Sequence, residues 1–553
     1  MIRQEIEKAI RAALSALGAP GAAFVVERPG DIAHGDYATN AALVAAKMLK
    51  KNPREVAEEL AAKLAVEGVK KVEVAGPGFI NFTLSGTTVK GIVHEAHESG
   101  WGSNILYKGK AVMVEYTSPN LFKPLHIGNL IGNILGESIA RILEQSGAQV
   151  DRLNYPSDIG PTIAKGVWGL QKLALDPSDI AQLGKAYIAG NEAYEADVTA
   201  KKEIEDINKA LYENTNPEWS GLREKGIATS LKHLHELCER LGTRFDTEFF
   251  ESQSGPIGAD IVRAHINDVF VESEGAIVFK GEEIGLHTRV FLNSQGLPTY
   301  EAKEVGLFEL KSKAYPDFDI SLTVTGGEQR DFFKVVFAAI GKLFADKVAG
   351  KRLKHIPTSF LRLTTGKMSS RKGNVITGES LLEDLKDAVK EKMKERDISD
   401  TEKISEQVAV GAIKYSTLKQ GSGRDIIFDP EKSLSLEGDS GPYAQYALVR
   451  ARALLRNAAS AKIIDPQPAG PAPVERLIVH FPQVVERAAR ELEPHHVTTY
   501  ITELAAAFNA WYASERMITD GAITSRTLAV VKAIENTLAN GLQVLGIPAP
   551  EEM

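Results

Sequence analysis

A proline-rich loop that carries a histidine is the first segment with residues suited to chemistry. In EYTSPNLFKPLHIGN, His126 and Gly128 lie between the expected end of a strand and the start of a helix. Unpaired backbone N–H groups and the helix dipole favour anions at such a position, and His126 and Lys123 add hydrogen-bond donors. The segment therefore suits a polyphosphate. The alternative is a histidine that only caps the helix.

A basic segment much further along the chain has the composition of a loop that closes over phosphates. In GKMSSRKGN, the cations Lys367, Arg371 and Lys372 alternate with serine and glycine. Mobile cationic loops of this kind neutralise charge during phosphoryl transfer, although a solvated basic turn is the alternative. The dinucleotide motif G-x-G-x-x-G and the phosphate-loop motif G-x-x-x-x-G-K-[ST] are absent from the sequence.

The elements that must position these two segments have the order of a nucleotide-binding fold. The apolar strand AVMVEYTS, a helix from about Gly128 to Gln145 and the strand QVDRLNY predict a βαβ unit, and such units form parallel sheets with right-handed crossovers. The later segment VFLNSQGLPTY is expected to resume this sheet. Ligands of open parallel sheets bind at the carboxyl ends of the strands, which is where the histidine loop begins.

The flanking regions predict separate domains. Helical patterns followed by the strand pair VKKVEVAGPGFINFTL predict a small α+β domain over residues 1–108. The parallel-sheet domain is expected over residues 109–375, with a charge-rich helical insertion at about 170–240. A connecting segment at 376–400 leads to residues 401–553, where helical periodicity without alternating strands predicts a helical bundle.

Composition excludes several classes of protein. The chain has 553 residues, of which 43% are hydrophobic and 25% are charged, and no apolar run is long enough to span a membrane. The N-terminus is an amphipathic helix of mixed charge rather than a signal peptide, so we expect a cytoplasmic protein. Its single cysteine, Cys238, allows neither an internal disulfide nor a multi-cysteine zinc site, even with His233 and His235 nearby, and we expect no structural metal. With a net charge of -8, any nucleic-acid surface must be local.

Several segments resemble a known enzyme family. HIGN and KMSSR, in that order, look like the two signature motifs of class I aminoacyl-tRNA synthetases, and EYTSPNLFKPLHIGN is similar to the longer first motif of the arginine-specific family. HGDYATNAALVAAK and AGPGFINF resemble the additional N-terminal domain of that family, which contacts the elbow of the tRNA. FDPEKSLSLEGDSGPYAQYALVRARALL resembles the opening of its helical anticodon-binding domain. The resemblance implies a multidomain α/β protein, in which a Rossmann-type parallel-sheet catalytic domain lies between an N-terminal α+β tRNA-binding domain and a C-terminal all-α anticodon-binding bundle.

The reaction that the resemblance implies is the ATP-dependent ligation of L-arginine to tRNA(Arg) through arginyl-adenylate, with Mg²⁺ accompanying ATP. The catalytic residues would be His126, Lys367 and Lys123. ATP would contact residues of both signature segments, namely His126, Gly128, Asn129, Lys367, Met368, Ser369 and Arg371. Arginine requires a receptor for its guanidinium, best made from carboxylates. The positions that match the family's arginine site are Glu115, Ser118, Asn120, Tyr300, Glu304 and Gln329.

The RNA contacts expected from the sequence are aromatic, polar and basic. Phe79 would stack on an unpaired base and Asn81 would read its edge. Tyr443, Arg450 and Trp511 combine aromatic rings with a cation in the C-terminal domain, as an anticodon site would. A place in the hydrophobic core is the alternative for Phe79 and for Trp511.

The sequence departs from the family pattern at a few positions. Asn129 stands where a second histidine is commonest, Ser370 where many class I enzymes have a lysine, Phe332 where the family usually has histidine, and Glu304 where aspartate is usual. Two alternatives are a non-catalytic RNA-binding relative and a class I ligase for another amino acid, such as cysteine or glutamate. The retained His126 and the two acidic positions favour an arginine enzyme, which we expect to be a monomer.

Overall fold

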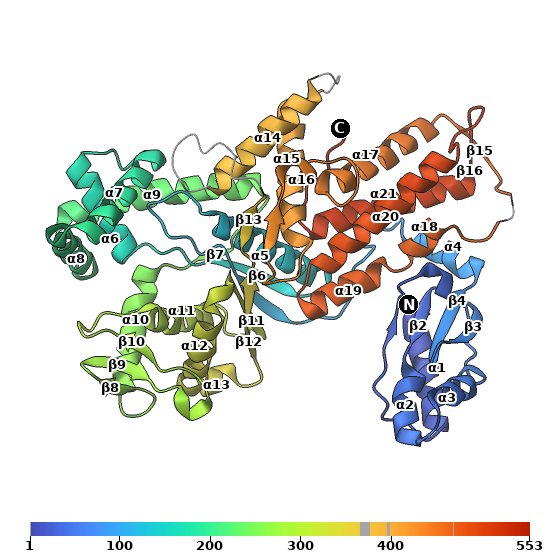
Figure 1. Ribbon diagram of the computed structural model, residues 1–553, viewed down its shortest axis with the longest axis horizontal. Helices are drawn as coiled ribbons and strands as arrows, with labels where there is room; N and C mark the ends of the chain where they lie inside the picture. Colours follow the sequence, from blue (N-terminus) through green and yellow to red (C-terminus); the bar gives the residue numbers. More distant parts are fainter. Residues whose placement is uncertain (1, 365–376, 395–398, 468) are drawn as a thin grey trace. The chain divides into compact units, whose positions relative to one another are not determined.

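The computed structural model describes residues 2–364, 377–394, 399–467 and 469–553. The chain divides into two compact units, whose elements are labelled in Figure 1. The larger unit comprises Ser103–Tyr446, Val485–Thr499 and Gly541–Met553, and the smaller unit comprises Met1–Gly102, Ala447–Val484 and Tyr500–Asn540. The C-terminal helices contribute residues to both units.

A parallel sheet forms the centre of the larger unit. Its strands follow the order β12-β11-β5-β6-β7, and all neighbouring pairs are parallel. The strands are β5 (Ala111–Glu115), β6 (Gln149–Asn154), β7 (Thr247–Glu248), β11 (Ile320–Gly326) and β12 (Arg352–Thr358). The predicted βαβ unit is confirmed, because helix α5 (Ile127–Gln145) connects β5 to its parallel neighbour β6.

Helix α5 lies close to the sheet because its sequence leaves room for the contact. Most of its side chains are buried, including Leu130, Ile134 and Ile139. A Cβ atom on Gly136 would lie 2.3 Å from Cγ of Tyr116, so only glycine permits this approach. The N-terminus of α5 is thereby held at the carboxyl edge of the sheet.

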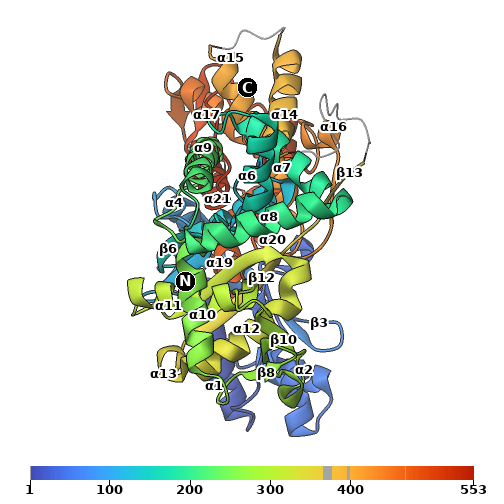
Figure 2. The same ribbon diagram turned by 90° about the vertical axis from the view of Figure 1, so that its left-hand side faces the viewer.

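A group of helices follows the first βαβ unit and supports the histidine loop. The helices α6 (Pro161–Leu173), α7 (Ile180–Ala196), α8 (Val198–Glu213) and α9 (Pro217–Arg240) share a hydrophobic core. They gather at the left of Figure 1 and face the viewer in Figure 2. Phe122, which belongs to the loop after β5, is fully buried in this core. The helices therefore anchor the segment that leads to His126.

Two glycines bring the next pair of helices into close contact. These helices are α10 (Glu251–Ala264) and α11 (Tyr300–Ala314). A Cβ atom on Gly258 would lie 1.8 Å from the carbonyl oxygen of Ala302, and a Cβ atom on Gly306 would lie 1.9 Å from that of Ser254. Any larger residue at these glycines would force the helices apart. The contact matters for function because both helices carry side chains of the cavity described below.

A small antiparallel sheet lies between α10 and α11 in the sequence. It contains β8 (Val271–Ser273), β9 (Ala276–Phe279) and β10 (Arg289–Leu292), in the order β10-β9-β8. The expectation that VFLNSQGLPTY resumes the parallel sheet is therefore wrong. A turn ends the strand, because the N–H of Gly296 donates to the carbonyl oxygen of Asn293 at 2.8 Å, and the rest of the segment leads into α11.

The larger unit is completed by short strands and by helices on either side of the second signature segment. They are α12 (Arg330–Leu343), α13 (Ala345–Val348), β13 (Leu361–Leu363), α14 (Gly378–Met393), α15 (Thr401–Leu418), β14 (Ile426–Phe428) and α16 (Pro430–Ser433). Strand β13 pairs in parallel with β14. Within the described ranges, no helix has both the length and the apolar character needed to cross a membrane.

The N-terminal α+β domain belongs to the smaller unit. Its antiparallel sheet has the order β1-β2-β4-β3, with strands β1 (Val26–Glu27), β2 (Tyr37–Thr39), β3 (Val69–Ala75) and β4 (Phe79–Leu84). Its helices are α1 (Ile2–Ala16), α2 (Ala41–Leu49), α3 (Pro53–Ala61) and α4 (Gly86–Glu95). The predicted strand pair is confirmed, since β3 and β4 form a hairpin around Gly76 and Gly78.

The C-terminal region is helical, as the sequence predicts. Its helices are α17 (Gly441–Ala458), α18 (Pro473–Ile478), α19 (Phe481–Glu491), α20 (His495–Ser514) and α21 (Ser525–Val544). The expectation of helices alone over residues 401–553 is wrong, because β14, β15 (Lys462–Ile464) and β16 (Ala522–Thr524) are present. Each has only three residues, which is too short to give a recognisable alternating pattern.

Candidate active site

The loop from β5 to α5 holds its backbone in strained conformations. Thr117, Ser118 and Phe122 have positive φ angles of 76°, 40° and 69°, a region that β-branched and bulky residues rarely adopt. The side-chain amide of Asn129 donates to the carbonyl oxygen of Thr117 at 2.9 Å, and that of Asn133 donates to its Oγ1 at 3.0 Å. Helix α5 therefore holds the loop in this form. Strain of this kind clusters at active sites.

His126 caps α5, and the cap determines which ring nitrogen carries the proton. Its Nδ1 accepts the backbone N–H of Gly128 at 3.1 Å, so in the neutral ring Nε2 bears the hydrogen. Burial lowers the pKa of His126, and the nearby charge of Lys123 lowers it further. The imidazole is therefore neutral near pH 7 and keeps an Nε2–H donor. Helix capping and phosphate binding use different nitrogens and do not exclude each other.

A cavity of about 810 Å³ opens at the carboxyl edge of the parallel sheet. Its lining includes the C-terminal residues of three neighbouring strands, Glu115 of β5, Gly326 of β11 and Thr358 of β12. The structure brings nine of the residues predicted from the sequence into this lining: Glu115, Ser118, Asn120, His126, Gly128, Asn129, Tyr300, Glu304 and Gln329. Residues assigned to ATP and residues assigned to arginine thus share one cavity.

The two acidic residues assigned to arginine have different partners. Glu115 is buried, and its Oε2 accepts a hydrogen bond from Nζ of Lys311 at 2.6 Å. Glu304 makes no ion pair with any described residue. Burial raises the pKa of Glu304 to about 8, with a further contribution from the negative charge of Glu115. Glu304 is therefore the carboxylate of this pair that has no cation of its own.

Several residues that line the cavity were not expected from the sequence, among them Tyr155, Ser157, Glu251 and Arg289. Ser157 follows closely on β6, so its place after a parallel strand was a usable signal. Glu251 is buried at the start of α10 and lies 2.5 Å from Nζ of Lys303. Glu251 and Arg289 belong to no motif, and only the folded chain brings them to the cavity.

Two polar atoms of lining residues are buried without a hydrogen-bond partner in the part of the chain that the structure describes. They are Oγ of Ser118 and Nε of Arg289. Buried polar atoms in proteins are nearly always hydrogen-bonded. Unpaired atoms in the wall of a cavity therefore indicate groups whose partner is a ligand or water.

Lys123, which was predicted to be catalytic, is not among the residues that line the cavity in the described part of the chain. Nζ of Lys123 lies 5.1 Å from the ring centroid of Tyr187 on α7, and burial lowers the pKa of Lys123. Four residues of the second signature segment, Lys367, Met368, Ser369 and Arg371, lie outside the described residues.

The chain that follows the second signature segment lies beside the first. Thr377 pairs with His126 through an antiparallel bridge. The N–H of Gly378, the first residue of α14, donates to the carbonyl oxygen of Leu125 at 3.0 Å. Thr377 and Gly378 therefore lie beside the histidine loop, although the sequence separates them widely from it.

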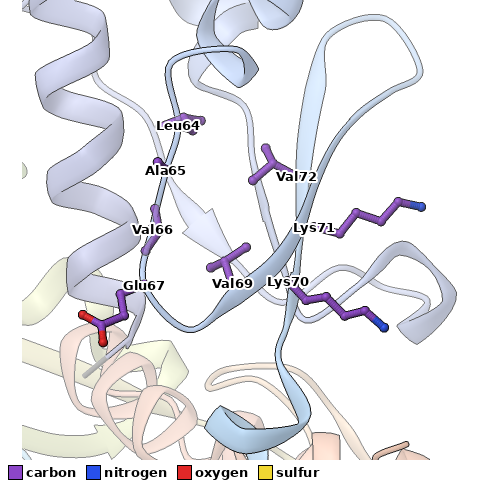
Figure 3. Close-up of a pocket in the computed structure, with 8 residues that line it drawn as sticks. All are labelled: Leu64, Ala65, Val66, Glu67, Val69, Lys70, Lys71 and Val72. Carbon is purple, nitrogen blue, oxygen red and sulfur yellow. The ribbon is translucent and has the colours of Figure 1, made fainter.

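Phe79 and Asn81, the residues predicted to contact RNA in the N-terminal domain, lie on β4. The side chain of Phe79 is 39% exposed, so it is not part of the core. Asn81 is opposite Glu73 of β3. A groove beside β3 is bordered by Lys70 and Lys71, whose side chains extend outward from the strand in Figure 3. This sheet thus presents an aromatic ring and exposed cations to solvent.

The residues predicted to contact RNA in the C-terminal helices have varied surroundings. Nη1 of Arg450 donates to Oδ1 of Asn509 at 2.5 Å, and its guanidinium lies 4.9 Å from the ring centroid of Tyr512. Trp511 is half-buried on α20. Tyr443, which belongs to the larger unit, is half-buried on α17.

The histidines near the single cysteine have other partners. His233 lies 3.3 Å from Glu379, His235 lies 3.1 Å from Glu248, and Cys238 is buried. Among the residues that the structure describes, no group of three or more His, Cys, Asp and Glu side chains is arranged to hold a metal ion.

Comparisons with known proteins agree with this architecture. Residues 96–430 match the model for the catalytic domain of class I tRNA synthetases (R), residues 4–84 match the arginyl tRNA synthetase N terminal domain, and residues 444–553 match the DALR anticodon binding domain. The arginine--tRNA ligase of Clostridium perfringens is 30% identical over 96% of both chains, and that of Latilactobacillus sakei is 30% identical over 100% of both. The solved arginyl-tRNA synthetase of Thermus thermophilus is 27% identical, covers 100% of both chains and gives a TM-score of 0.81.

A Rossmann-type parallel sheet, a histidine loop at its carboxyl edge and a helical domain that matches an anticodon binding domain are the features of a class I aminoacyl-tRNA synthetase. Within that class, the chain belongs to the arginyl-tRNA synthetase family. It is an enzyme that ligates arginine to tRNA in translation, with ATP as the energy source. The alternatives of a ligase for another amino acid and of a non-catalytic relative are thereby excluded.

Proposed function

We propose that the cavity at the carboxyl edge of the sheet is where arginine is activated, with the amino acid on the side of α11 and ATP on the side of α5. The observation that carries the proposal is the convergence of nine predicted residues on one cavity of about 810 Å³. The unpaired Oγ of Ser118 supports it, because a polar ligand would supply the missing hydrogen-bond partner.

Glu304 is the main receptor for the arginine guanidinium in this proposal. A guanidinium binds best to an ionised carboxylate, with charge-assisted bonds about twice as strong as neutral ones. Because Glu115 already binds Lys311, Glu304 is the acid better placed to accept a new cation. Ser118, Asn120, Tyr300 and Gln329, which line the same cavity, hold the rest of the amino acid.

ATP binds at the N-terminus of α5, where His126 donates its Nε2–H to the phosphates. Gly128 allows a close backbone approach and Asn129 keeps the loop in place through Thr117. Lys367, Met368, Ser369 and Arg371 of the second signature segment contact ATP. Lys367 neutralises charge that develops on the phosphates, and Lys123 adds a cation nearby. Mg²⁺ enters with ATP as part of the substrate.

The chemistry requires orientation and charge stabilisation rather than a covalent nucleophile. The carboxylate of arginine attacks the α-phosphorus of ATP in line with the departing pyrophosphate, which gives arginyl-adenylate. A hydroxyl group at the 3′ end of the tRNA then attacks the carbonyl carbon of the adenylate, which forms the arginyl ester and releases AMP. The protein must therefore hold one carboxylate oxygen close to the α-phosphorus and stabilise the leaving group.

The domains outside residues 109–375 bind tRNA(Arg) in this proposal. Residues 1–108 contact the elbow through Phe79 and Asn81, and residues 401–553, joined by the connecting segment 376–400, contact the anticodon region through Tyr443, Arg450 and Trp511. The exposed ring of Phe79 supports the first assignment. We propose further that the enzyme acts in the cytoplasm as a monomer.

The test separates the two sides of the cavity. A His126→Ala variant should slow the formation of arginyl-adenylate in a single-turnover assay with tRNA present, while the Kd for arginine stays close to the wild-type value. A Glu304→Gln variant should weaken arginine binding and leave the KM for ATP nearly unchanged. If both variants impair arginine and ATP equally, the division of the cavity into two subsites is wrong.

A further inference from the structure

Arg289 stands at the cavity wall with an incompletely used guanidinium. It is the first residue of β10, and its Nη1 donates to Oε1 of Glu301 at 3.1 Å. The guanidinium carbon lies 5.5 Å from the ring centroid of Phe332 on α12. These two contacts hold the side chain in place. Its Nε–H is buried and has no acceptor among the described residues. The guanidinium is therefore held in position while one of its donors still lacks a hydrogen bond.

The charges around Arg289 indicate which kind of ligand group accepts its unpaired Nε–H. Four glutamates line the cavity, namely Glu115, Glu251, Glu304 and Glu328. Within the described part of the chain, Arg289 is the only lysine or arginine in that lining. Arginine as a substrate carries two cationic groups and one anion, its α-carboxylate. A cavity rich in carboxylates suits the cations, whereas the anion needs a donor such as Arg289.

The partners of Arg289 place it on the amino-acid side of the cavity. Glu301 is three residues from Glu304 on α11, so the two side chains lie on the same face of that helix. Phe332 of α12 likewise lies three residues after Gln329, which is the residue just before that helix. The guanidinium of Arg289 is therefore held beside the residues proposed to bind arginine, whereas Gly128 and Asn129, which are proposed for ATP, lie on α5.

We propose that Arg289 binds the α-carboxylate of the arginine substrate, with its Nε–H donating to one carboxylate oxygen. The second oxygen stays free to attack the α-phosphorus. Together with Glu304, Arg289 fixes the direction of the bound amino acid, because exchange of the two ends would place a cation against Arg289 and an anion against Glu304. This inference rests on the proposed arginine site.

The experiment compares arginine with agmatine, which is arginine without its carboxylate. Isothermal titration calorimetry gives the Kd of each ligand for the wild type and for Arg289→Met. We expect the variant to bind arginine about ten- to a hundred-fold more weakly, as for the loss of one charged hydrogen bond, while its affinity for agmatine changes little. An Arg289→Lys variant keeps a cation for Glu301 but lacks the Nε–H. Arg289→Lys should show the same loss of the preference for arginine over agmatine, and it tests the proposal even if Arg289→Met does not fold.

The matched control is Arg263→Met. Arg263 lies on α10, pairs with Asp260 at 3.1 Å and is not a lining residue, so its loss should leave both affinities unchanged.

Phe332→Leu, which removes the ring that contacts Arg289, should weaken the binding of arginine more than the binding of agmatine. The proposal is overturned if Arg289→Met and Arg289→Lys weaken both ligands equally, or neither, or if the wild type does not prefer arginine over agmatine. Failure of the wild type to bind either ligand would instead reject the arginine site itself.

Discussion

Arginine binding should become tighter as the pH rises from 6 to 8, because Glu304 must lose a proton to accept the guanidinium. Burial and the neighbouring Glu115 raise the pKa of Glu304 to about 8. Below that value the free enzyme carries mostly the neutral acid, which accepts a guanidinium poorly. The substrate guanidinium stays charged throughout this range. Binding should therefore release a proton from Glu304.

The size of the effect follows from the fraction of enzyme that is ready to bind. With a pKa near 8, roughly 1% of Glu304 is ionised at pH 6 and about half at pH 8. Because the apparent Kd varies inversely with the competent fraction, it should fall roughly fifty-fold between these two pH values. Replacing Glu304 by Gln removes the titrating group. This variant should bind arginine more weakly than the wild type at pH 8, by about 2 to 4 kcal/mol, and with little dependence on pH.

Calorimetry at several pH values, in buffers of different ionisation enthalpy, measures both the Kd and the number of protons released. Glu115→Gln is the contrasting variant, since it leaves the buried ammonium of Lys311 without its partner. It should lower the thermal stability and move the pH dependence of the Kd to lower pH, because the negative charge of Glu115 no longer raises the pKa of Glu304 and the charge of Lys311 lowers it. A wild-type Kd that is constant from pH 6 to 8, or a Glu304→Gln variant that binds arginine normally at pH 8, would refute the reasoning.

Three further outcomes are expected. Lys367→Ala should slow adenylate formation far more than it weakens arginine binding, because the cation acts on charge that develops in the transition state; equal effects in single-turnover and binding assays would contradict this. Phe79→Ala should raise the KM for tRNA without loss of stability, because Phe79 is 39% exposed. The control is Phe82→Ala at a fully buried position, which should lower the free energy of unfolding by about 3 to 5 kcal/mol. An unchanged KM for tRNA in Phe79→Ala would remove that residue from the RNA site. Gly258→Ala should lower the free energy of unfolding by about 1 to 3 kcal/mol and weaken arginine binding, because the new Cβ would lie 1.8 Å from the carbonyl oxygen of Ala302. Denaturant unfolding measures the stability and calorimetry measures the binding. Wild-type values of both would show that α10 and α11 adapt to the larger residue.

The parts of the fold that could be predicted are those with long, regular patterns. The first βαβ unit follows from an apolar strand and a long amphipathic helix that ends near Gln145, and both elements have the expected bounds to within a few residues. The three-residue strands β14, β15 and β16 could not be predicted, because their pairing depends on distant segments. For the same reason, β10 was assigned to the wrong sheet.

The candidate site divides in a similar way. The residues near His126 could be found because they lie in one contiguous motif. The ion pair between Glu115 and Lys311 joins positions far apart in the sequence, and no local pattern indicates it. Arg289 was missed because its significance comes from an unpaired Nε–H and from its contact with Glu301, which only tertiary structure provides.

The most direct test of the account is amino-acid-dependent pyrophosphate exchange, measured with tRNA present for each of the twenty amino acids in turn. In the proposed site, the cavity activates the amino acid whose guanidinium Glu304 accepts. We therefore predict exchange with arginine, little exchange with lysine, whose compact ammonium lacks the planar donor fork, and strong loss of the arginine signal in Glu304→Gln. Exchange driven equally well by lysine or by a neutral amino acid, or an arginine signal that survives in Glu304→Gln, would contradict this assignment.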